Sequence, residues 1–473
     1  MTRQTIHRLD ERHQAYLRDE SRMLGAAQSL SFPEDEDEIV AVVAEMRHRR
    51  IPVTVQGGRT GLAGAAVPLR GHVMNLSRMN RTEAPERRED GTWVVRVEPG
   101  TTLLDLRRAL AGAQVERALF WPPDPTEATA TVGGVVSCNA RGLTAMRYGS
   151  TRDHVEALRL VTADGAAKAV VRGEGALHPD CGLDALDLAV GSEGMFGVIS
   201  ALALRLLPKP PEVWGICFFF RDRQSLCAFV DHLVSVPPHA SASLAAMEYL
   251  DRRAITIVEE RKTIVTSIQG LPDVDPAALA MVYVELHGDG EGAVADLAES
   301  LMEIVVETGG DPDGAWAVSG EAEVERLRAF RHAAAESANL LIERVRLSSP
   351  SIVKLSTDMS LPGLPFSTAL DLYDSGLSRE GLDACVFGHL PQNRLNVNLL
   401  PRDPDEHLRG RRLIEDWAAQ VIALGGQPVN EHGAGKLKKD LVAKCSTGTR
   451  WQELRRCKTA LDPEEFWNPG NMF

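Results

Sequence analysis

Three glycine clusters between residues 55 and 198 constrain the fold more than any other feature of this chain. The first, Gln56-Gly-Gly-Arg-Thr-Gly-Leu-Ala-Gly64, directly follows the apolar segment 52–55, which is predicted to be a short buried strand. The second is Thr131-Val-Gly-Gly134 and the third is Gly191-Ser-Glu-Gly194. Glycine accepts positive φ and lets backbone N–H groups approach an anion closely. Tight turns around a core explain one such loop equally well, but three together favour a shared phosphate-bearing ligand.

Composition and simple motifs exclude several other classes of protein. The first glycine loop has neither the Gly-x-Gly pair of a dinucleotide fingerprint nor the Gly-Lys-Ser/Thr of a P-loop. The net charge of −14 argues against nucleic acid as a partner. The seven cysteines form no CxxC pair, so neither a metal cluster nor a disulfide scaffold is indicated, and reduced thiols fit the cytoplasm. We expect no signal peptide and no membrane span, so any membrane association would be peripheral.

The chain divides near residue 208. Residues 34–49 are predicted to form an amphipathic helix, because Ile39, Val42, Val43 and Met46 recur at helical spacing. Three prolines in the run 206–213 are expected to interrupt any regular element there. Beyond this run, strand-like segments (214–220 and 281–286) alternate with helical ones (292–308 and 321–344), which is an α+β pattern.

The motif order of the first part resembles the FAD-binding domain of the vanillyl-alcohol oxidase and p-cresol methylhydroxylase (PCMH) superfamily. Besides the glycine clusters, the resemblance rests on Val97-Glu-Pro-Gly-Thr101 and Tyr148-Gly-x-Thr-Arg-Asp-His154. It implies that the FAD pyrophosphate is surrounded by Gly57, Gly58, Arg59, Thr60 and Gly61, with Thr131, Gly134, Asn139, Asp153, Glu193, Gly194, Gly197 and Ile199 nearby. The glycine loop has no histidine where members with covalent flavin carry one, so we expect FAD to be bound non-covalently.

Three motifs of the second part resemble FAD-linked D-2-hydroxyacid dehydrogenases, the family of D-lactate and D-2-hydroxyglutarate dehydrogenases and of the glycolate oxidase flavin subunit. They are Gly388-His-x6-Asn396-Val-Asn398, Asn430-Glu-His-Gly-x-Gly435 and Leu461-Asp-Pro-x4-Asn468-Pro-Gly470. The resemblance implies an α+β protein with a two-domain PCMH-type fold. We expect an N-terminal extension at 1–26, the FAD-binding domain at 27–208 and a C-terminal substrate domain at 209–473.

The resemblance also implies a reaction, the oxidation of a D-2-hydroxy acid of the lactate, glycolate or 2-hydroxyglutarate class to the 2-oxo acid. Such a reaction needs a base with a pKa near neutral and cations for the carboxylate. His432 suits the base, and Arg331 and Lys354 suit the carboxylate. Asn398 matches a position that contacts substrate, and Asn468 one near the flavin. Each has a simpler alternative, since a lone histidine is often structural and Arg331 could lie on a solvated helix face.

The electron acceptor is expected to be external: a quinone, a cytochrome or an electron-transfer flavoprotein. Two other interpretations stay open at this point. The chain could be an oxidase of a sugar lactone or another alcohol, producing hydrogen peroxide. It could also be a flavin-carrying subunit of a larger redox complex that has lost turnover. A homodimer is equally open.

One departure from the family lies at its metal site. Relatives read Gly-His-x6-His and add the glutamate of Glu-His-Gly to bind a divalent metal such as zinc or manganese. Here His389 and Glu431 are kept, but Asn396 replaces the second histidine. An amide oxygen is a poorer zinc ligand than imidazole, and the nearby Arg394 adds positive charge. The sequence therefore favours a site without metal.

Overall fold

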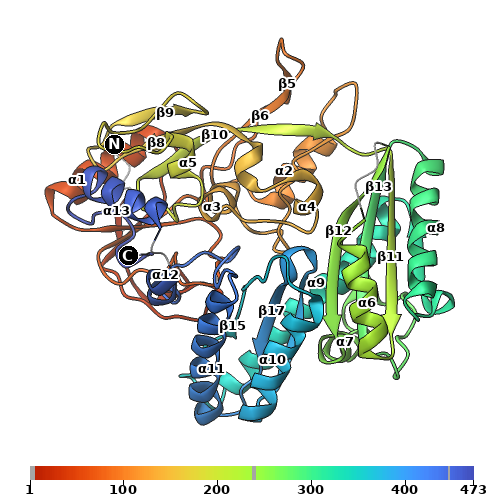
Figure 1. Cartoon of the computed structure of the whole chain (residues 1–473). Helices are drawn as coiled ribbons and strands as arrows, with labels where there is room; N and C mark the ends of the chain where they lie inside the picture. The colour runs from red at the N-terminus through yellow and green to blue at the C-terminus, as the bar shows by residue number, and fades with distance from the viewer. Residues whose placement is uncertain (1–5, 237–240, 446–447, 473) are drawn as a thin grey trace. The chain divides into compact units, whose positions relative to one another are not determined.

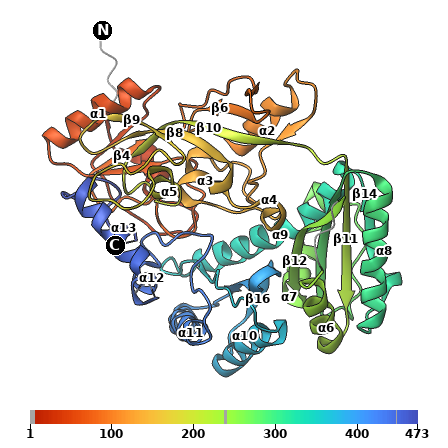
Figure 2. The same cartoon turned by 45° about the horizontal axis from the view of Figure 1, so that its top comes forward.

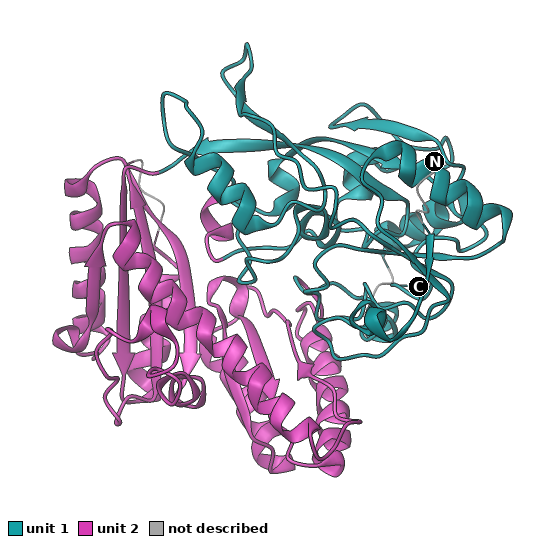
Figure 3. Cartoon of the chain, turned by 180° about the vertical axis from the view of Figure 1, so that it is seen from behind, with its two compact units in different colours: residues 1–142, 149–209, 431–473 teal, residues 143–148, 210–430 magenta. Residues whose placement is uncertain are grey.

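The computed structural model describes residues 6–236, 241–445 and 448–472, and it divides into two compact units (Figure 3). Unit 1 comprises residues 1–142, 149–209 and 431–473, and unit 2 comprises residues 143–148 and 210–430. These units follow the expected division near residue 208 but not the rest of the three-segment scheme. Residues 431–473 join the glycine loops in unit 1, where Val53 N donates to Phe466 O over 2.8 Å. Residues 143–148 instead belong to unit 2.

Unit 1 is built on two sheets. In the first, with order β1-β2-β4-β3, strand β4 is parallel to both β2 and β3. Its strands are β1 Ile6–Arg8, β2 Ser29–Ser31, β3 Val53–Gln56 and β4 His72–Asn75. The second sheet is antiparallel, with order β5-β6-β10-β8-β9 and β7 paired to β10. Its strands are β5 Glu86–Arg87, β6 Trp93–Val97, β7 Leu119–Phe120, β8 Val155–Val161, β9 Ala167–Val171 and β10 Val198–Pro208.

Helix α1, Glu36–His48, confirms the prediction made for residues 34–49. Asp35 caps it by accepting a hydrogen bond from Glu38 N, and Ile39, Val42, Val43 and Met46 are all buried. The helix packs against β8 and β10 (Figure 2). The other helices of unit 1 are α2 Leu103–Ala111, α3 Val132–Cys138, α5 Ala185–Ala189, α12 Lys439–Cys445 and α13 Thr449–Leu461, with 3₁₀ helices at Glu11–Leu17 and Thr151–His154.

Unit 2 is an antiparallel seven-stranded sheet with helices on both faces (Figure 1). The strand order is β14-β11-β13-β12-β16-β17-β15. The strands are β11 Glu212–Phe220, β12 Ala242–Asp251, β13 Ala280–Gly288, β14 Trp316–Ser319, β15 Leu355–Ser356, β16 Ala384–His389 and β17 Arg394–Leu399. The helices are α4 Ala145–Tyr148, α6 Arg223–Leu233, α7 Arg252–Glu259, α8 Glu291–Glu307, α9 Glu321–Arg346, α10 Phe366–Glu380 and α11 Pro404–Ala423, with 3₁₀ helices at Thr266–Ile268, Pro312–Gly314 and Pro391–Asn393. The α+β pattern expected for this part of the chain is confirmed.

The run of prolines separates two long strands, β10 and β11. Strand β10 continues to Pro208, which pairs with Leu119 at the end of β7, and β11 begins at Glu212. The prediction that these prolines interrupt regular structure is confirmed, because residues 209–211 belong to neither strand. A proline can end a strand because the ladder does not need its missing N–H there. Within the described residues, no helix combines the length and apolar character that a membrane crossing requires.

Candidate functional site

The first two glycine clusters lie against each other in unit 1. Strand β3 leads directly into Gly57 and Gly58. A Cβ atom on Gly57 would overlap Oγ1 of Thr131, and one on Gly58 would lie 2.7 Å from the carbonyl oxygen of Thr129. Thr131 caps α3 and accepts a hydrogen bond from Gly134 N over 3.4 Å. The absence of side chains at these two glycines is what allows the loop to rest on the start of α3.

Asn468 ties the third cluster to the same place. Its Oδ1 accepts from Val55 N over 2.9 Å, and its Nδ2 donates to Gly194 O over 2.7 Å. Its own backbone N–H donates to Val53 O over 2.8 Å. The side-chain amide thus joins β3 to the Gly191–Gly194 turn. The three glycine clusters that the sequence singled out are neighbours in one unit.

Glu193 fixes the turn that carries His432. Its carboxylate is buried and accepts hydrogen bonds from Ala434 N over 2.6 Å and from Gly435 N over 2.8 Å. Burial raises the pKa of Glu193, which the two backbone donors partly oppose. A Cβ on Gly433, where φ is +73°, would lie 2.5 Å from Oε1 of Glu193. Glu193 therefore positions the His432 turn beside the glycine clusters.

Several residues that the resemblance assigns to the FAD site have structural roles in unit 1: they fix backbone turns or fill its core. Asn139 ends α3 in the left-handed region, with φ +49°, and accepts from Arg152 N over 2.9 Å. Asp153 accepts from Ser150 N over 2.7 Å. The remaining ones are Gly197, where a Cβ would lie 2.5 Å from Val161 O, and Ile199, which is buried in a hydrophobic core cluster.

The residues of unit 1 fit a phosphate-bearing cofactor. The loop 57–61 offers a cradle that side chains would fill, and it carries a buried donor, Nε of Arg59, that has no hydrogen-bond partner among the described residues. Another nitrogen of the same guanidinium is held by the N-terminal segment, because Nη1 donates to Ala15 O over 2.6 Å. The Arg59 side chain is thus fixed at one nitrogen and keeps Nε as a donor at the loop.

In unit 2, a buried ion triad joins Arg331 to a strand carboxylate. Nε of Arg331 on α9 donates to Oε2 of Glu248 on β12 over 2.8 Å, and Oε1 of Glu248 contacts Nδ1 of His389 at the end of β16. Glu248 is fully buried and Arg331 is 3% exposed. Burial alone would raise the pKa of Glu248, but His389 and Arg331 hold it below its ordinary value. The solvated-face alternative for Arg331 is wrong, because the side chain points to the sheet.

A second triad of the same kind lies one helical turn away and was not expected from the sequence. Arg328 donates from Nε to Oε2 of Glu285 over 2.8 Å, and His287 Nε2 contacts Oε1 of Glu285 at 2.5 Å. These contacts overcome burial and lower the pKa of Glu285 to about 2. His287 also contacts the hydroxyl of Tyr148 over 2.7 Å. A charged residue at position 285 of an apolar strand was the available signal, because buried carboxylates need partners.

The other predicted residues of unit 2 share the face of His389. Directly opposed residues of antiparallel strands point to one face. On β17, Arg394 is opposite His389, Asn396 opposite Phe387 and Asn398 opposite Cys385. All three β17 residues are buried. The half-buried Lys354 directly precedes β15, which pairs with β17. Arg331, Arg394, Asn396 and Asn398 therefore gather on one side of the sheet.

The donor set does not fit the divalent metal that the resemblance implies. His389 alone is arranged as a ligand would be, because a carboxylate holds its Nδ1. Asn396 supplies an amide where imidazole is required, and the Arg394 cation is opposite His389 in the strand pair. Across the described ranges, no cluster of three or more His, Cys, Asp or Glu side chains is arranged to hold a metal ion.

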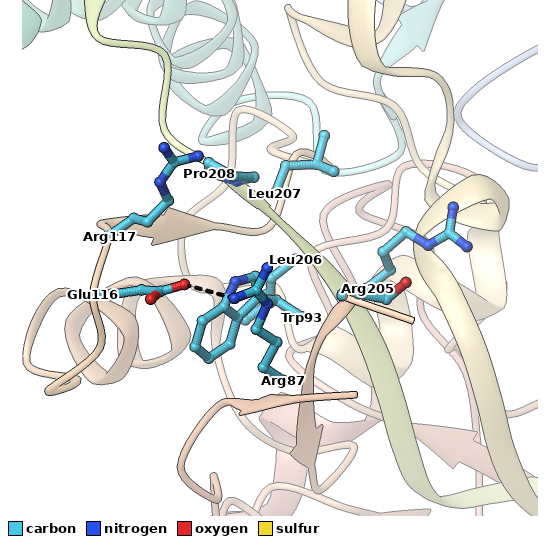
Figure 4. Close-up of a pocket in the computed structure, with 10 residues that line it drawn as sticks. Arg87, Trp93, Glu116, Arg117, Arg205, Leu206, Leu207 and Pro208 are labelled. Atoms are coloured by element: carbon cyan, nitrogen blue, oxygen red, sulfur yellow. Dashed lines mark hydrogen bonds and ion pairs between the residues drawn. The ribbon is translucent and has the colours of Figure 1, made fainter. Parts of the chain in front are cut away.

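Unit 1 also has a cavity of about 680 Å³ (Figure 4), which lies between the β5–β6 hairpin, the loop before β7 and the end of β10. Its arginines are largely neutralised: Arg87 pairs with Glu116 at 3.0 Å and Arg205 pairs with Glu156 at 2.6 Å. Its lining contains none of the predicted site residues. We therefore do not count this cavity as part of the candidate site.

A first prediction concerns the Glu248 triad. Glu248→Gln removes the anion that the buried Arg331 guanidinium and the His389 ring both contact, so we expect the free energy of unfolding to fall by about 3–5 kcal/mol. The matched control is Asp383→Asn, in an exposed pair with Arg253, which should change it by less than about 1 kcal/mol. Because the pKa of Glu248 is lowered, its contribution exists above the ordinary carboxyl pKa and is lost on acidification below it. Denaturant titration at neutral and acidic pH measures both effects; equal losses in the two variants would contradict the prediction.

The fold and the glycine cradle define a PCMH-type flavoenzyme, and comparison with known proteins makes this specific. Residues 27–170 match the model of the FAD binding domain, and residues 218–472 match that of the C-terminal domain of FAD linked oxidases. The chain belongs to the FAD-linked oxidases and is an FAD-dependent oxidoreductase.

Named relatives span nearly the whole chain at modest identity. A D-lactate dehydrogenase of Anaerostipes hadrus is 27% identical over 98% of this chain and 93% of its own length. Glycolate oxidase subunit GlcD of Bacillus subtilis is 27% identical over 93% of this chain and 88% of its own length. The mitochondrial D-2-hydroxyglutarate dehydrogenase of Bos taurus is 27% identical over 95% and 77%, respectively. A solved alkyldihydroxyacetonephosphate synthase shares the fold, with a TM-score of 0.69 and 14% identity over 99% of this chain and 82% of its own.

Proposed function

We propose that this chain oxidises a D-2-hydroxy acid to the 2-oxo acid and passes two electrons to an external acceptor. The observation that carries the proposal is the buried Arg331, held on the sheet of unit 2 by Glu248. The names of the relatives agree with it, since they act on lactate, glycolate and 2-hydroxyglutarate as named. All three are small acids with a hydroxyl group beside a carboxylate.

Arg331 is suited to bind the substrate carboxylate. Within the described part of the chain, its hydrogen bond to Glu248 uses only Nε, and the guanidinium rests on the Phe387 ring with 4.8 Å between Cζ and the ring centroid. An arginine carries five N–H donors in a planar fork, which matches a carboxylate bidentately. Glu248 and Phe387 thus fix the plane of the fork. We assign Lys354 as the second cation and Asn398 as a further substrate contact.

His432 is assigned as the general base. In the proposed step a ring nitrogen of His432 takes the hydroxyl proton as the C2–H bond breaks with its electron pair and C2–O becomes a carbonyl group. Bound FAD supplies the flavin N5 that accepts this hydride. The anchoring of the following turn by Glu193 supports the assignment, because a base must be held in position. Electrons then leave to a quinone, a cytochrome or an electron-transfer flavoprotein.

Anaerobic mixing of the purified protein with a panel of acids tests the proposal. D-lactate, L-lactate, glycolate and both enantiomers of 2-hydroxyglutarate are compared by bleaching of the visible flavin absorbance. We expect at least one D-2-hydroxy acid or glycolate to bleach it and the L enantiomers to be much slower. Bleaching by sugar lactones alone, with oxygen consumption in air, would favour the oxidase alternative. A chain that no acid reduces would instead be a flavin-carrying subunit.

The same preparation yields a prediction about metal. Because Asn396 and the buried Arg394 disfavour a divalent cation, chelator treatment should leave turnover unchanged, and elemental analysis of protein made without a His tag should find far less than one equivalent of zinc or manganese. Arg394 or Lys354 would then stabilise the developing alkoxide. The Asn396→His variant should bind zinc more tightly than the parent chain. About one tightly held metal ion per parent chain would contradict this prediction.

We also place the protein in the cytoplasm. The cysteines whose side chains are described are all free thiols, and four of them are buried. Reduced thiols are typical of a reducing compartment. Cell fractionation with a tagged full chain tests this location.

A further inference from the structure

Residues 6–25, which lie outside the matched FAD-binding model, pack on the first glycine loop. Nε2 of Gln56 donates to Tyr16 O over 2.8 Å, and Nη1 of Arg59 donates to Ala15 O over 2.6 Å. In return, Glu20 N donates to Arg59 O over 3.2 Å. The Arg59 guanidinium also stacks on the Tyr16 ring, with 4.4 Å between Cζ and the ring centroid. This segment therefore packs directly against the glycine loop as a wall of the FAD site and is not a separate extension.

Asp19 projects from this wall toward the loop with half of its carboxyl group unused. The residue is 3% exposed. Its Oδ1 accepts from Ser21 N over 3.0 Å and also contacts the Ser21 hydroxyl. Its Oδ2 is buried and has no hydrogen-bond partner among the described residues. A Cβ atom on Gly61 would lie 3.7 Å from that oxygen. A buried carboxyl oxygen without a partner is costly, so its position beside Gly61 points to a bound group.

The charges around Asp19 are few. Lys436 is near enough to interact, but its Nζ is already bonded to the carbonyl oxygens of Gly64 and Ala65 and to Asn471 Oδ1, the last over 2.6 Å. Glu20 and the Cys138 thiol are the other titratable neighbours that interact with Asp19. Burial is the largest influence and raises the pKa of Asp19 to about 6. Burial likewise lowers the pKa of Lys436 to about 8.

We propose that Asp19 is part of the FAD site and, in its protonated form, donates a hydrogen bond from Oδ2 to the cofactor's pyrophosphate. The family resemblance assigns the loop 57–61 to the FAD pyrophosphate, so the cofactor group expected beside Gly61 is a phosphate. A phosphate presents only acceptors, and it repels an ionised carboxylate but accepts a short, strong bond from a carboxylic acid. The inference goes beyond the proposed function, because it concerns cofactor binding and holds for any substrate.

Protonation of Asp19 then couples FAD binding to pH. The pKa of about 6 belongs to the cofactor-free protein, and the phosphate raises it further on binding. FAD binding therefore takes up a proton at any pH at which Asp19 is ionised in the free protein. The FAD dissociation constant should be flat below about pH 6 and should rise above it by up to about tenfold per pH unit. Because Lys436 titrates near pH 8, the measurement is confined to the range below about pH 7.

The test measures FAD affinity of the apoprotein by flavin fluorescence between about pH 5.5 and 7. Asp19→Asn keeps the shape and a donor but no titratable group, so it should bind FAD as the parent does at the acid end and show no slope. Asp19→Ala should bind about tenfold more weakly at the acid end, since a hydrogen bond to a charged group is lost. The matched control, Glu11→Gln, removes the charge of an exposed acid in the same segment and should follow the parent at every pH.

A second measurement needs no variant. Calorimetry of FAD binding to the parent apoprotein at about pH 7, in two buffers with different ionisation enthalpies, should show uptake of close to one proton. The proposal is overturned if the parent affinity does not depend on pH in this range and no proton is taken up. It is also overturned if Asp19→Asn binds FAD as weakly as Asp19→Ala at the acid end while both apoproteins melt at the parent temperature.

Discussion

Replacement of His432 by alanine should lower the rate of flavin reduction by about 10²- to 10⁴-fold and leave the affinity for the hydroxy acid nearly unchanged. General-base catalysis typically contributes this much, because the base acts on the hydroxyl proton only as the C2–H bond breaks. Rapid mixing under anaerobic conditions measures the reduction rate at saturating acid, and its concentration dependence gives the affinity.

The control for His432→Ala is His48→Ala, at the exposed last residue of α1 in the same unit. It should reduce its flavin at the parent rate. Visible absorbance before mixing shows whether each variant is loaded with FAD, which matters because Glu193 anchors the backbone two and three residues after His432. A fully loaded His432→Ala protein with an unchanged rate at saturating acid would show that another residue is the base.

Local patterns in the sequence were sufficient to predict the elements that have a strong hydrophobic periodicity or positions that only glycine can occupy. Helix α1 follows from the spacing of Ile39, Val42, Val43 and Met46, because burial of one face dictates that spacing. The convergence of the glycine clusters also followed, since Gly57 and Gly58 are required where the loop rests on the start of α3. The constraint on α1 lies within a few residues of the chain, whereas each glycine cluster reveals its long-range contact only through its residue type.

The sequence could not predict which residues contact each other in the two buried triads, because their members come from distant parts of the chain. Glu248 and Arg331 are brought together only when α9 packs on the sheet of unit 2, and the sequence offers no local signal for that contact. The sequence did single out Arg331 and His389, but it missed the carboxylate between them. A single acid within the apolar run of β12 or β13 was the usable sign, because the interior tolerates Glu248 and Glu285 only with cationic partners.

The sequence analysis also missed the contacts that residues near the two ends of the chain make with the glycine clusters. Asp19 was included in an N-terminal extension, and Asn468 was expected only to lie near the flavin. In the structure, Asp19 lies beside Gly61, and Asn468 joins β3 to the third glycine cluster through Val55 N and Gly194 O. Such long-range closure depends on the assembled sheet of unit 1, where β3 is an edge strand beside the C-terminal segment.

The Gly58→Ala variant should lose most of its FAD. A Cβ on Gly58 would lie 2.7 Å from the backbone oxygen of Thr129, which a rotamer change cannot move, so the loop must shift away from the start of α3. Overpacking of this kind costs about 1–3 kcal/mol, or about 5- to 150-fold in affinity if the loss falls on the holoprotein. Gly58→Val, with a larger side chain, should be isolated colourless.

The control for Gly58 is Gly112→Ala, because a Cβ at that position of unit 1 would meet its neighbours at 3.5 Å or more. It should keep the parent's yellow colour and FAD affinity. Acid precipitation of the parent should leave all of its FAD in the supernatant, since the loop 57–64 has no histidine for a covalent bond. Flavin that stays with the precipitate would refute non-covalent binding. A Gly58→Val protein that is folded and fully loaded would show that the cofactor does not depend on the close contact between this loop and Thr129, and the phosphate cradle would have to be sought at another glycine cluster of unit 1.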